Sequence, residues 1–246
     1  MASNQPIQLT RDNGLRSRMY LTMFMLAGVY AFFILLLIAA GIPLVFVVGI
    51  AAVMVGIQYF ASDRMILRST GAKEVTREQA PELYDMVERL SIRADMPMPK
   101  VAIMESAAPN AFATGRNPKN ALVAVTTGIQ ERLTRRELEA VIGHELSHVK
   151  NRDVTVITLA SFFLTVASFV MQMMFFRMMF GGFGGGRNNN GGAIMMLMVG
   201  TLVVQFVAQL LIMALSRYRE YGADHSGAEL TGDPGALANA LEKISA

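Results

Sequence analysis

The chain has 246 residues, of which 53% are hydrophobic and only 17% charged, and its mean hydropathy is +0.40. This composition excludes a disordered chain and argues against an ordinary soluble domain. The absence of cysteine excludes disulfide frameworks, iron–sulfur clusters, cysteine-ligated zinc and thiol nucleophiles. The net charge is only +3, and the surplus of arginine lies beside apolar segments. We therefore expect membrane-topology signals and no nucleic-acid binding.

The first apolar segment is too long for a single membrane crossing. No charged residue occurs between Met19 and Ser62, whereas one helical span needs about 20 residues. Glycine and proline in Gly41-Ile42-Pro43 can form a turn near its middle, so residues 19–61 are predicted to form a transmembrane hairpin of two spans. A cleaved signal peptide is the alternative interpretation, but a second apolar run follows the weak cleavage site directly.

Residues 154–215 predict a second transmembrane hairpin. The charge-free runs Val154–Phe176 and Ala193–Leu215 are each long enough to cross the hydrocarbon core. Between them, residues 181–192 are rich in glycine and asparagine, which is typical of a flexible loop. A phosphate-binding loop is not expected there, because no strand precedes the glycines and no helix-capping lysine follows them.

Two hairpins would return the chain each time to the side on which it began. Residues 1–18, 62–153 and 216–246 are therefore predicted to share one aqueous compartment. The basic residues that flank the first hairpin lie on this side, namely Arg11, Arg16, Arg18, Arg64 and Arg68. By the positive-inside rule this compartment is the cytoplasm. We expect a multi-pass protein of the cytoplasmic (inner) membrane, with its N-terminus in the cytoplasm.

The segment 62–153 has the pattern of a mixed α and β domain. A helix is predicted from Pro81, because apolar residues then recur at helical spacing. Lys100–Met104 and Ala121–Thr127 are predicted strands bounded by turn residues. Thr134-Arg-Arg-Glu137 is a capping-box pattern, which predicts the start of another helix. The predicted fold class is an α+β integral membrane protein with four transmembrane helices.

The capped helix contains the motif His144-Glu145-Leu-Ser-His148, which points to metal chemistry. Two histidines four residues apart lie on the same helix face, so both imidazoles can reach one ion. This is the HExxH arrangement of zinc hydrolases, in which the glutamate acts as general base. The sequence therefore predicts one Zn²⁺ per chain, with Glu145 as the catalytic residue. Two buried core histidines are the alternative interpretation.

Zinc held by two histidines needs a third protein ligand and an open position for water. Glu220 and His225, both after the last apolar run, could supply that ligand. Glu220 is favoured because Asp224 shares its helix face and can accept a hydrogen bond from a ligand histidine, while His225 lies on a different side. A solvated Glu220 paired with a neighbouring arginine is the alternative.

The order of spans, with His-Glu-Leu-Ser-His and then Ser-Arg-Tyr-Arg-Glu-Tyr-Gly-Ala-Asp, resembles the HtpX family. These are membrane-integrated zinc metalloproteases related to the CAAX prenyl endoproteases. The resemblance implies a gluzincin-like domain on the cytoplasmic side, acting on misfolded or damaged membrane proteins under stress. It makes His144, His148 and Glu220 the metal ligands and Asp224 a supporting residue.

The resemblance also implies a substrate-binding edge strand near the zinc. The matching residues are Asn110, Ala111, Phe112 and Ala113, with Asn110 holding the substrate backbone. From the residues alone, a polar turn at a strand start is the alternative. Family members continue well past Ala246, so we expect a C-terminal portion to be missing, together with the residue that stabilises the tetrahedral intermediate.

The predicted function is a membrane-bound zinc metalloendopeptidase with polypeptide substrates. A scaffold or adaptor with a structural zinc is an alternative, although such a site is normally closed by four protein ligands. A site-2-type intramembrane protease is another, but the charged residues around the motif belong in water. A transporter is not expected, because the spans lack the ionisable residues that mark ion paths; Gln172, Gln205 and Gln209 are predicted to hydrogen-bond between helices. The sequence does not indicate an oligomeric state.

Overall fold

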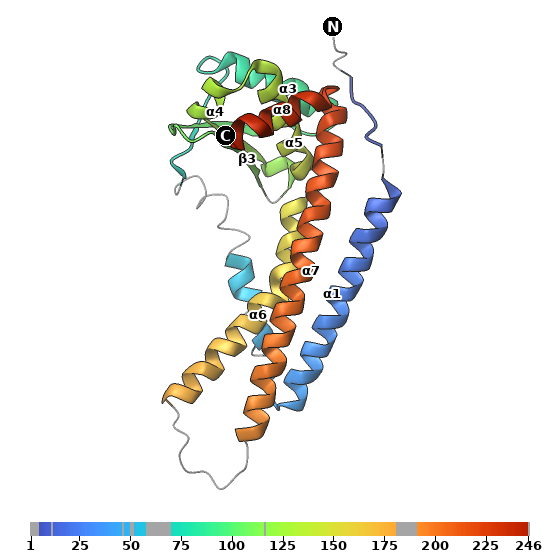
Figure 1. Ribbon diagram of the computed structural model, residues 1–246. Helices are drawn as coiled ribbons and strands as arrows, with labels where there is room; N and C mark the ends of the chain where they lie inside the picture. The colour runs from blue at the N-terminus through green and yellow to red at the C-terminus, as the bar shows by residue number, and fades with distance from the viewer. Residues whose placement is uncertain are drawn as a thin grey trace. The chain divides into compact units, whose positions relative to one another are not determined.

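The structure, a computed structural model, describes residues 5–10, 12–45, 47–49, 52–57, 70–115, 117–180 and 191–245. The chain folds as two compact units, each assembled from segments far apart in the sequence. The first unit combines Met1–Asn13, Tyr59–Val156 and Arg219–Ala246, and the second combines Gly14–Gln58 and Ile157–Tyr218. Helices and one small sheet confirm the predicted α+β class (Figure 1).

The first unit contains a four-stranded sheet with strand order β1-β2-β4-β3. The strands are β1 (Lys73–Glu74), β2 (Lys100–Met104), β3 (Ala111–Thr114) and β4 (Leu122–Thr126). β2 and β4 pair in parallel, whereas β1 and β3 run antiparallel to their neighbours. The two strands predicted from periodicity are confirmed as β2 and β4. β3 lies at one edge of the sheet.

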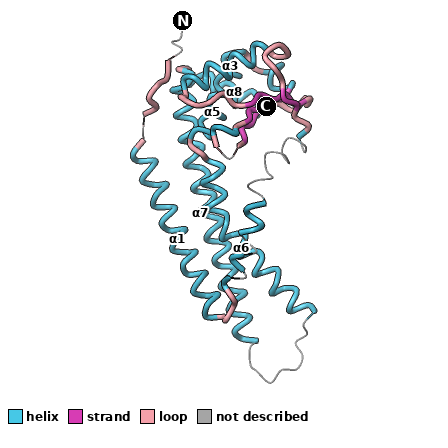
Figure 2. Tube along the Cα trace, turned by 180° about the vertical axis from the view of Figure 1, so that it is seen from behind, coloured by secondary structure: helices cyan, strands magenta, loops and turns pink. Residues whose placement is uncertain are grey.

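Helices pack against this sheet and bury its core. They are α3 (Pro81–Arg93), the short α4 (Thr127–Arg132), α5 (Arg135–Lys150) and α8 (Pro234–Ser245), which Figure 2 shows gathered beside the strands. Ile142 and Leu146 of α5 are completely buried together with Val123 and Val125 of β4. Full burial of such side chains contributes about 1.5–3 kcal/mol each. This apolar face fixes α5, and with it the histidines that the helix carries.

The start of α5 is fixed by the predicted capping box. The Glu137 backbone N–H donates to the Thr134 hydroxyl, and the Thr134 N–H donates to the Glu137 carboxylate. That carboxylate is buried and also lies 2.7 Å from the Lys243 ammonium of α8. The Lys243 ammonium and the Thr134 N–H hold the pKa of Glu137 at about 2, well below its ordinary value of 4.5.

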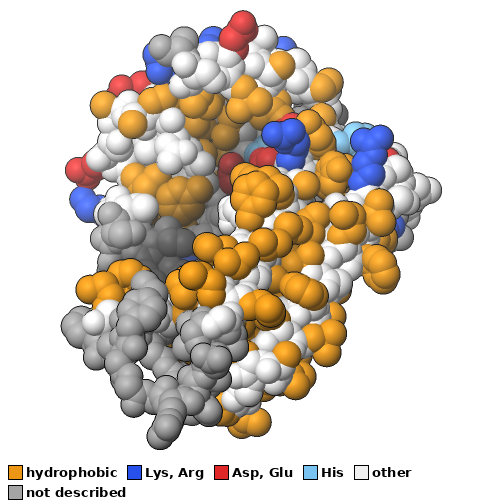
Figure 3. Space-filling model, turned by 60° about the horizontal axis from the view of Figure 1, so that its bottom comes forward, with side chains coloured by type: hydrophobic (Ala, Val, Ile, Leu, Met, Phe, Trp, Pro, Cys, Tyr) orange, Lys and Arg blue, Asp and Glu red, His pale blue; other side chains and the backbone are white. Residues whose placement is uncertain are grey.

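The second unit consists of long apolar helices. Among the described residues, three helices are long and apolar enough to cross a membrane: α1 (Asn13–Ala39), α6 (Asp153–Phe180) and α7 (Gly191–Thr231). Within the unit, Phe33 of α1 is buried with Val170 of α6 and Val204 of α7. Many of the other apolar side chains on these helices are exposed, and Figure 3 shows such side chains covering the helices that it brings forward. This surface is suited to lipid.

The predicted spans match these helices with some differences. α1 begins at Asn13, before the predicted start of the first span, and α7 continues beyond the predicted end of the last span, to Thr231. The second predicted span corresponds to a shorter apolar helix, Val47–Ile57. Several sequence predictions lie outside the described residues: most of the glycine and asparagine loop, the end of the second span, and Arg11, Arg64 and Arg68.

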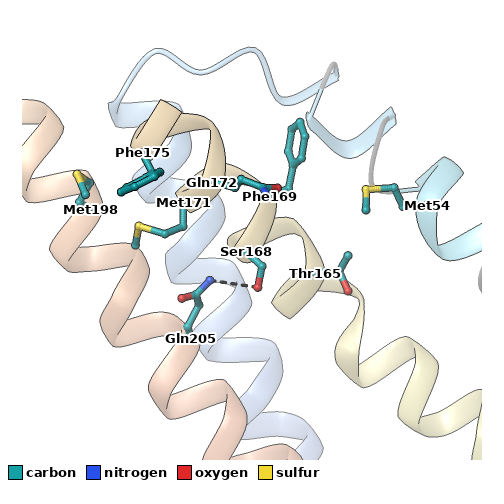
Figure 4. Close-up of a pocket in the computed structure, with 9 residues that line it drawn as sticks. All are labelled: Met54, Thr165, Ser168, Phe169, Met171, Gln172, Phe175, Met198 and Gln205. Atoms are coloured by element: carbon teal, nitrogen blue, oxygen red, sulfur yellow. Dashed lines mark hydrogen bonds between the residues drawn. The ribbon is translucent and has the colours of Figure 1, made fainter. Parts of the chain in front are cut away.

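A cavity of about 540 Å³ lies within the second unit (Figure 4). Its lining is mainly methionine and phenylalanine, with Gln172 and Gln205 among the polar members. The Gln205 amide of α7 donates to the Ser168 hydroxyl of α6 at 3.2 Å, which confirms the predicted interhelical role for this glutamine. The described lining residues include neither a carboxylate nor a histidine, so the metal ligands predicted from the sequence do not line this cavity.

Replacing Lys243 with Met is expected to lower the Tm of the detergent-solubilised chain at pH 7 by a few degrees, because the buried, ionised Glu137 loses its partner. Because the pKa of Glu137 is lower in the folded chain than its ordinary value, the ionised carboxylate stabilises the fold above pH 4.5. This contribution is lost as the pH falls from 4.5 toward 2 and the carboxylate becomes protonated. The difference in Tm between the wild type and Lys243→Met should therefore narrow over that pH range, as measured by differential scanning fluorimetry.

The control variant is Lys73→Met, which breaks an exposed ion pair of similar length, 2.9 Å, with Glu105. Exposed pairs contribute little, so its Tm should stay close to that of the wild type. Equal losses of Tm in the two variants would contradict a special role for the buried pair.

Candidate metal centre

The end of α5 directs two imidazoles toward the same point. His144 and His148 are one helical turn apart, and their Nε2 atoms lie 3.1 Å from each other. Their side chains are only 16% and 19% exposed. The helical spacing found in the sequence therefore brings the two rings together within the first unit.

A third donor comes from α7, far away in the sequence. Glu220 places its Oε2 atom 3.4 Å from His144 Nε2 and 3.5 Å from His148 Nε2. Donors bound to zinc at about 2.0–2.1 Å in a tetrahedron are separated by about 3.3 Å, so the three observed separations fit one ion. The three residues form the only such group found among the described histidines and carboxylates.

Two aspartates approach the opposite nitrogens of these rings. Asp224 Oδ1 lies 2.9 Å from His144 Nδ1, but off the direction of a good hydrogen bond, so this contact is electrostatic. Asp153 Oδ2 lies 2.6 Å from His148 Nδ1, and its carboxylate also pairs with Arg219 at 2.8 Å. The sequence analysis missed Asp153 and treated it as a flanking charge. The sequence carries no local signal for this contact, because a charge directly before an apolar run is typical of a membrane boundary.

Glu145 lies beside the donor group and next to the sheet. Its Oε2 atom accepts a hydrogen bond of 3.0 Å from the backbone N–H of Ala113 in β3. Burial raises the pKa of the Glu145 carboxyl above 4.5, an effect that the nearby His144 and the Ala113 N–H oppose. A carboxylate with a raised pKa is better suited to accept and return a proton near neutral pH.

The outer edge of β3, which pairs with no further strand among the described residues, faces the same region. Asn110 pairs with Thr126 through its carbonyl, which accepts from the Thr126 N–H at 2.9 Å. In antiparallel pairing the direction of the backbone groups alternates, so Ala111 and Ala113 point theirs away from β4. The Ala113 N–H that binds Glu145 agrees with this alternation. Phe112 shares the intermediate exposure of its two neighbours, and Asn110 is exposed.

The sequence profile of Peptidase family M48 matches residues 77–245, which include the whole donor group. The chain belongs to this family. It is 58% identical to a protease HtpX homolog of Moorella thermoacetica, over 97% of this chain and 79% of the relative. It is 52% identical to protease HtpX homolog 2 of Methanosarcina acetivorans, over 96% and 79% of the two chains.

The fold is also similar to a solved structure. The crystal structure of S. mikatae Ste24p superimposes with a TM-score of 0.60 at 19% sequence identity, over 95% of this chain. The match covers 60% of the length of the Ste24p chain. Family membership and the HtpX relatives identify the chain as a membrane-bound metalloprotease.

The other candidate ligand of the M48 chain, His225, is engaged away from the donor group. Its Nε2 atom lies 2.8 Å from the Thr10 hydroxyl and 3.6 Å from Glu229 Oε1. The same Glu229 carboxylate accepts a hydrogen bond of 2.9 Å from the Thr10 N–H. His225 therefore joins the N-terminal segment to the end of α7.

Glycines let α5 and α7 approach closely at the donor group. A Cβ atom on Gly227 would lie 2.9 Å from both the backbone N and the Cα of His144. On the α5 side, a Cβ on Gly143 would lie 2.9 Å from the Thr231 methyl group. The sequence analysis missed both positions, although a glycine inside a helix often marks a packing constraint.

If the donor group holds a metal ion, replacing Gly227 with Ala is expected to weaken metal binding by about tenfold, the scale seen when groups that orient ligands are disturbed. Helix propensity alone would favour alanine by about 1 kcal/mol. A loss of metal affinity would therefore come from the clash with the His144 backbone. The measurement is competition with a chelator of known affinity. Gly235→Ala is the matched control, because its Cβ would meet only Asp233 Oδ1 at an ordinary 3.6 Å. Wild-type affinity in Gly227→Ala would refute the packing argument.

Proposed function

We propose that this chain is a zinc metalloendopeptidase that hydrolyses peptide bonds of misfolded or damaged membrane proteins, as part of quality control under stress. The proposal is carried by one observation: three donor atoms lie 3.1–3.5 Å apart beside the partly buried carboxylate of Glu145. The names of its relatives, protease HtpX homologs, support the protease assignment, and the proposed substrate class rests on the resemblance of the sequence motifs to the HtpX family.

His144, His148 and Glu220 would hold one Zn²⁺ per chain. Two imidazole nitrogens and one carboxylate oxygen are a donor set typical of catalytic zinc. When bound, zinc supplies a Lewis acid that polarises a peptide carbonyl and makes water more acidic. The Glu220 side chain is 54% exposed, which supports an open site that substrate and water can reach.

Glu145 would act as general base and then as general acid. Its carboxylate accepts a proton from the attacking water and passes that proton to the amide nitrogen as the C–N bond breaks. The hydrogen bond from the Ala113 N–H fixes the carboxylate next to β3. The proton acceptor is therefore held beside the strand where substrate would lie.

The free edge of β3 would bind the substrate backbone through Asn110, Ala111, Phe112 and Ala113. An extended peptide could pair with the N–H and C=O of Ala111 and with the C=O of Ala113, all of which point away from β4. The Ala113 N–H is already engaged with Glu145, so the peptide would not use it. The exposed Asn110 side chain could add a further contact to the substrate backbone.

We also propose four membrane spans, over residues 19–61 and 154–215, with the metal centre facing the cytoplasm. Support comes from contacts within the first unit: the Ile7 N–H donates to the Arg93 carbonyl, and Thr10 contacts His225 and Glu229. These contacts require the N-terminal segment and residues 70–153 to share one compartment. Because α1 separates them and is long enough to cross, these contacts support a return crossing before residue 70.

Replacing Glu145 with Gln is expected to keep one zinc per chain and to slow casein cleavage in detergent by about 10²–10⁴-fold. The amide can still accept from the Ala113 N–H, so the change mainly removes the proton acceptor. Zinc content is measured by mass spectrometry and cleavage on gels. Wild-type cleavage by this variant would show that Glu145 is not the base.

The control is His225→Ala, which should retain both zinc and cleavage, because His225 faces Thr10 and Glu229. Loss of zinc from this variant would instead favour a closed structural site that includes His225, and hence a scaffold rather than an enzyme.

The absence of native cysteine makes the topology testable with single cysteines. We expect a membrane-impermeant maleimide to label Ala40→Cys in spheroplasts, and Gln8→Cys and Glu131→Cys only in inside-out vesicles. The three native residues are exposed. Labelling of Gln8→Cys and Glu131→Cys from opposite sides would contradict the return crossing, and the reverse pattern for all three would place the site outside the cytoplasm.

A further inference from the structure

Asp153 is a buried carboxylate directly behind the donor group. It is the first residue of α6 and is only 6% exposed. Its Oδ2 atom lies 2.6 Å from Nδ1 of His148, whose Nε2 atom faces His144 and Glu220. An ionised carboxylate only accepts hydrogen bonds, so this contact favours the tautomer with the proton on Nδ1. The lone pair on Nε2 is then directed toward the donor group.

Arg219 holds Asp153 by two atoms. Its Nη2 atom lies 2.8 Å from Asp153 Oδ2, and its Nη1 atom donates to the Asp153 backbone carbonyl. Both side chains are buried, at 7% and 8% exposure. A guanidinium that contacts side chain and backbone together fixes the position of the residue as well as its charge.

The backbone before Asp153 is also constrained. Arg152 has φ of 55°, in the left-handed region that side chains other than glycine rarely adopt. Its N–H donates to the Val149 carbonyl at 3.1 Å, and its carbonyl accepts from the N–H of Thr155 at 3.0 Å. Such a conformation persists where surrounding contacts hold it. Asp153 lies one residue further on, and its contacts with Arg219 and His148 can hold the backbone of Arg152 in this conformation.

The chain order connects these residues to all three donors. Asp153 follows the α5 helix that carries both histidines, and Arg219 directly precedes Glu220 in α7. The path from His148 through Asp153 and Arg219 to Glu220 therefore joins the two sides of the donor group by short, buried contacts. Asp224 is different, because its side chain is 47% exposed and its contact with His144 lies off the hydrogen-bond direction.

We propose that Asp153 is the positioning residue for His148, and that Arg219 acts through Asp153 to fix the distance between the α5 histidines and Glu220. This inference rests on the proposed metal site. It assigns a function to two buried charges that otherwise lie beside the site without a role in hydrolysis.

The test measures zinc affinity by chelator competition, and the visible spectrum of the Co²⁺-substituted protein, in the full chain in detergent. Asp153→Ala is expected to weaken zinc binding by about 10–100-fold and to alter the Co²⁺ spectrum. Asp153→Asn should lose less, because its amide oxygen can still accept from His148 Nδ1. Arg219→Met should weaken binding in the wild-type background but add little in the Asp153→Ala background, because it acts through Asp153.

Two controls separate positioning from folding. Glu74→Gln removes another ion-paired carboxylate of the same unit, which pairs with Lys100 at 2.7 Å and lies on β1, at the opposite edge of the sheet from β3; this variant should bind zinc with wild-type affinity. The Tm of each metal-free variant reports its fold, and Asp153→Asn keeps the side-chain shape if Asp153→Ala fails to fold.

Zinc affinity and a Co²⁺ spectrum close to wild type in folded Asp153→Ala and Asp153→Asn would overturn the inference. Full additivity of Arg219→Met and Asp153→Ala would overturn the part assigned to Arg219. A wild-type chain that binds no zinc would instead overturn the proposed function, so the two failures can be told apart.

Discussion

The distance between α5 and α7 is the constraint on which the metal centre depends. Two donors come from one helix and the third from the other, so any change in that distance separates the donors. Gly143 and Gly227 allow the helix backbones to approach until a methyl group would not fit at Gly227. Because the clash would involve the His144 backbone itself, no change of rotamer could relieve it. The two glycines thus determine how far the donor on α7 lies from the two donors on α5.

Contacts from distant parts of the chain support this helix pair. Lys150, at the end of α5, donates to the Ala94 carbonyl after α3 at 2.6 Å, and Lys243 of α8 holds the beginning of α5 through Glu137. Thr10 binds Glu229 near the end of α7. Both helices are therefore fixed near their ends by residues outside the donor group. A site supported in this way depends on the fold of the whole first unit.

The local parts of this structure could be predicted from the sequence, and the long-range parts could not. His144 and His148 follow from helical periodicity, and the capping box at Thr134 is a pattern of four residues. Strand β1 has only two residues, so it leaves no periodic signal and exists through its pairing with β2. Asp153 was missed because a charge before an apolar run is typical of a membrane boundary. Its importance depends on contacts with His148 and Arg219 that only the fold creates.

The open edge of β3 has a consequence for selectivity. A strand that offers main-chain groups reads the backbone of its partner, which is the same in every protein, rather than a particular side-chain sequence. To pair with that edge, a protein must first release several residues from its own hydrogen bonds. If substrate binds β3 as we propose, the free energy of that local opening, small in a damaged protein and large in an intact one, sets which chains are cut.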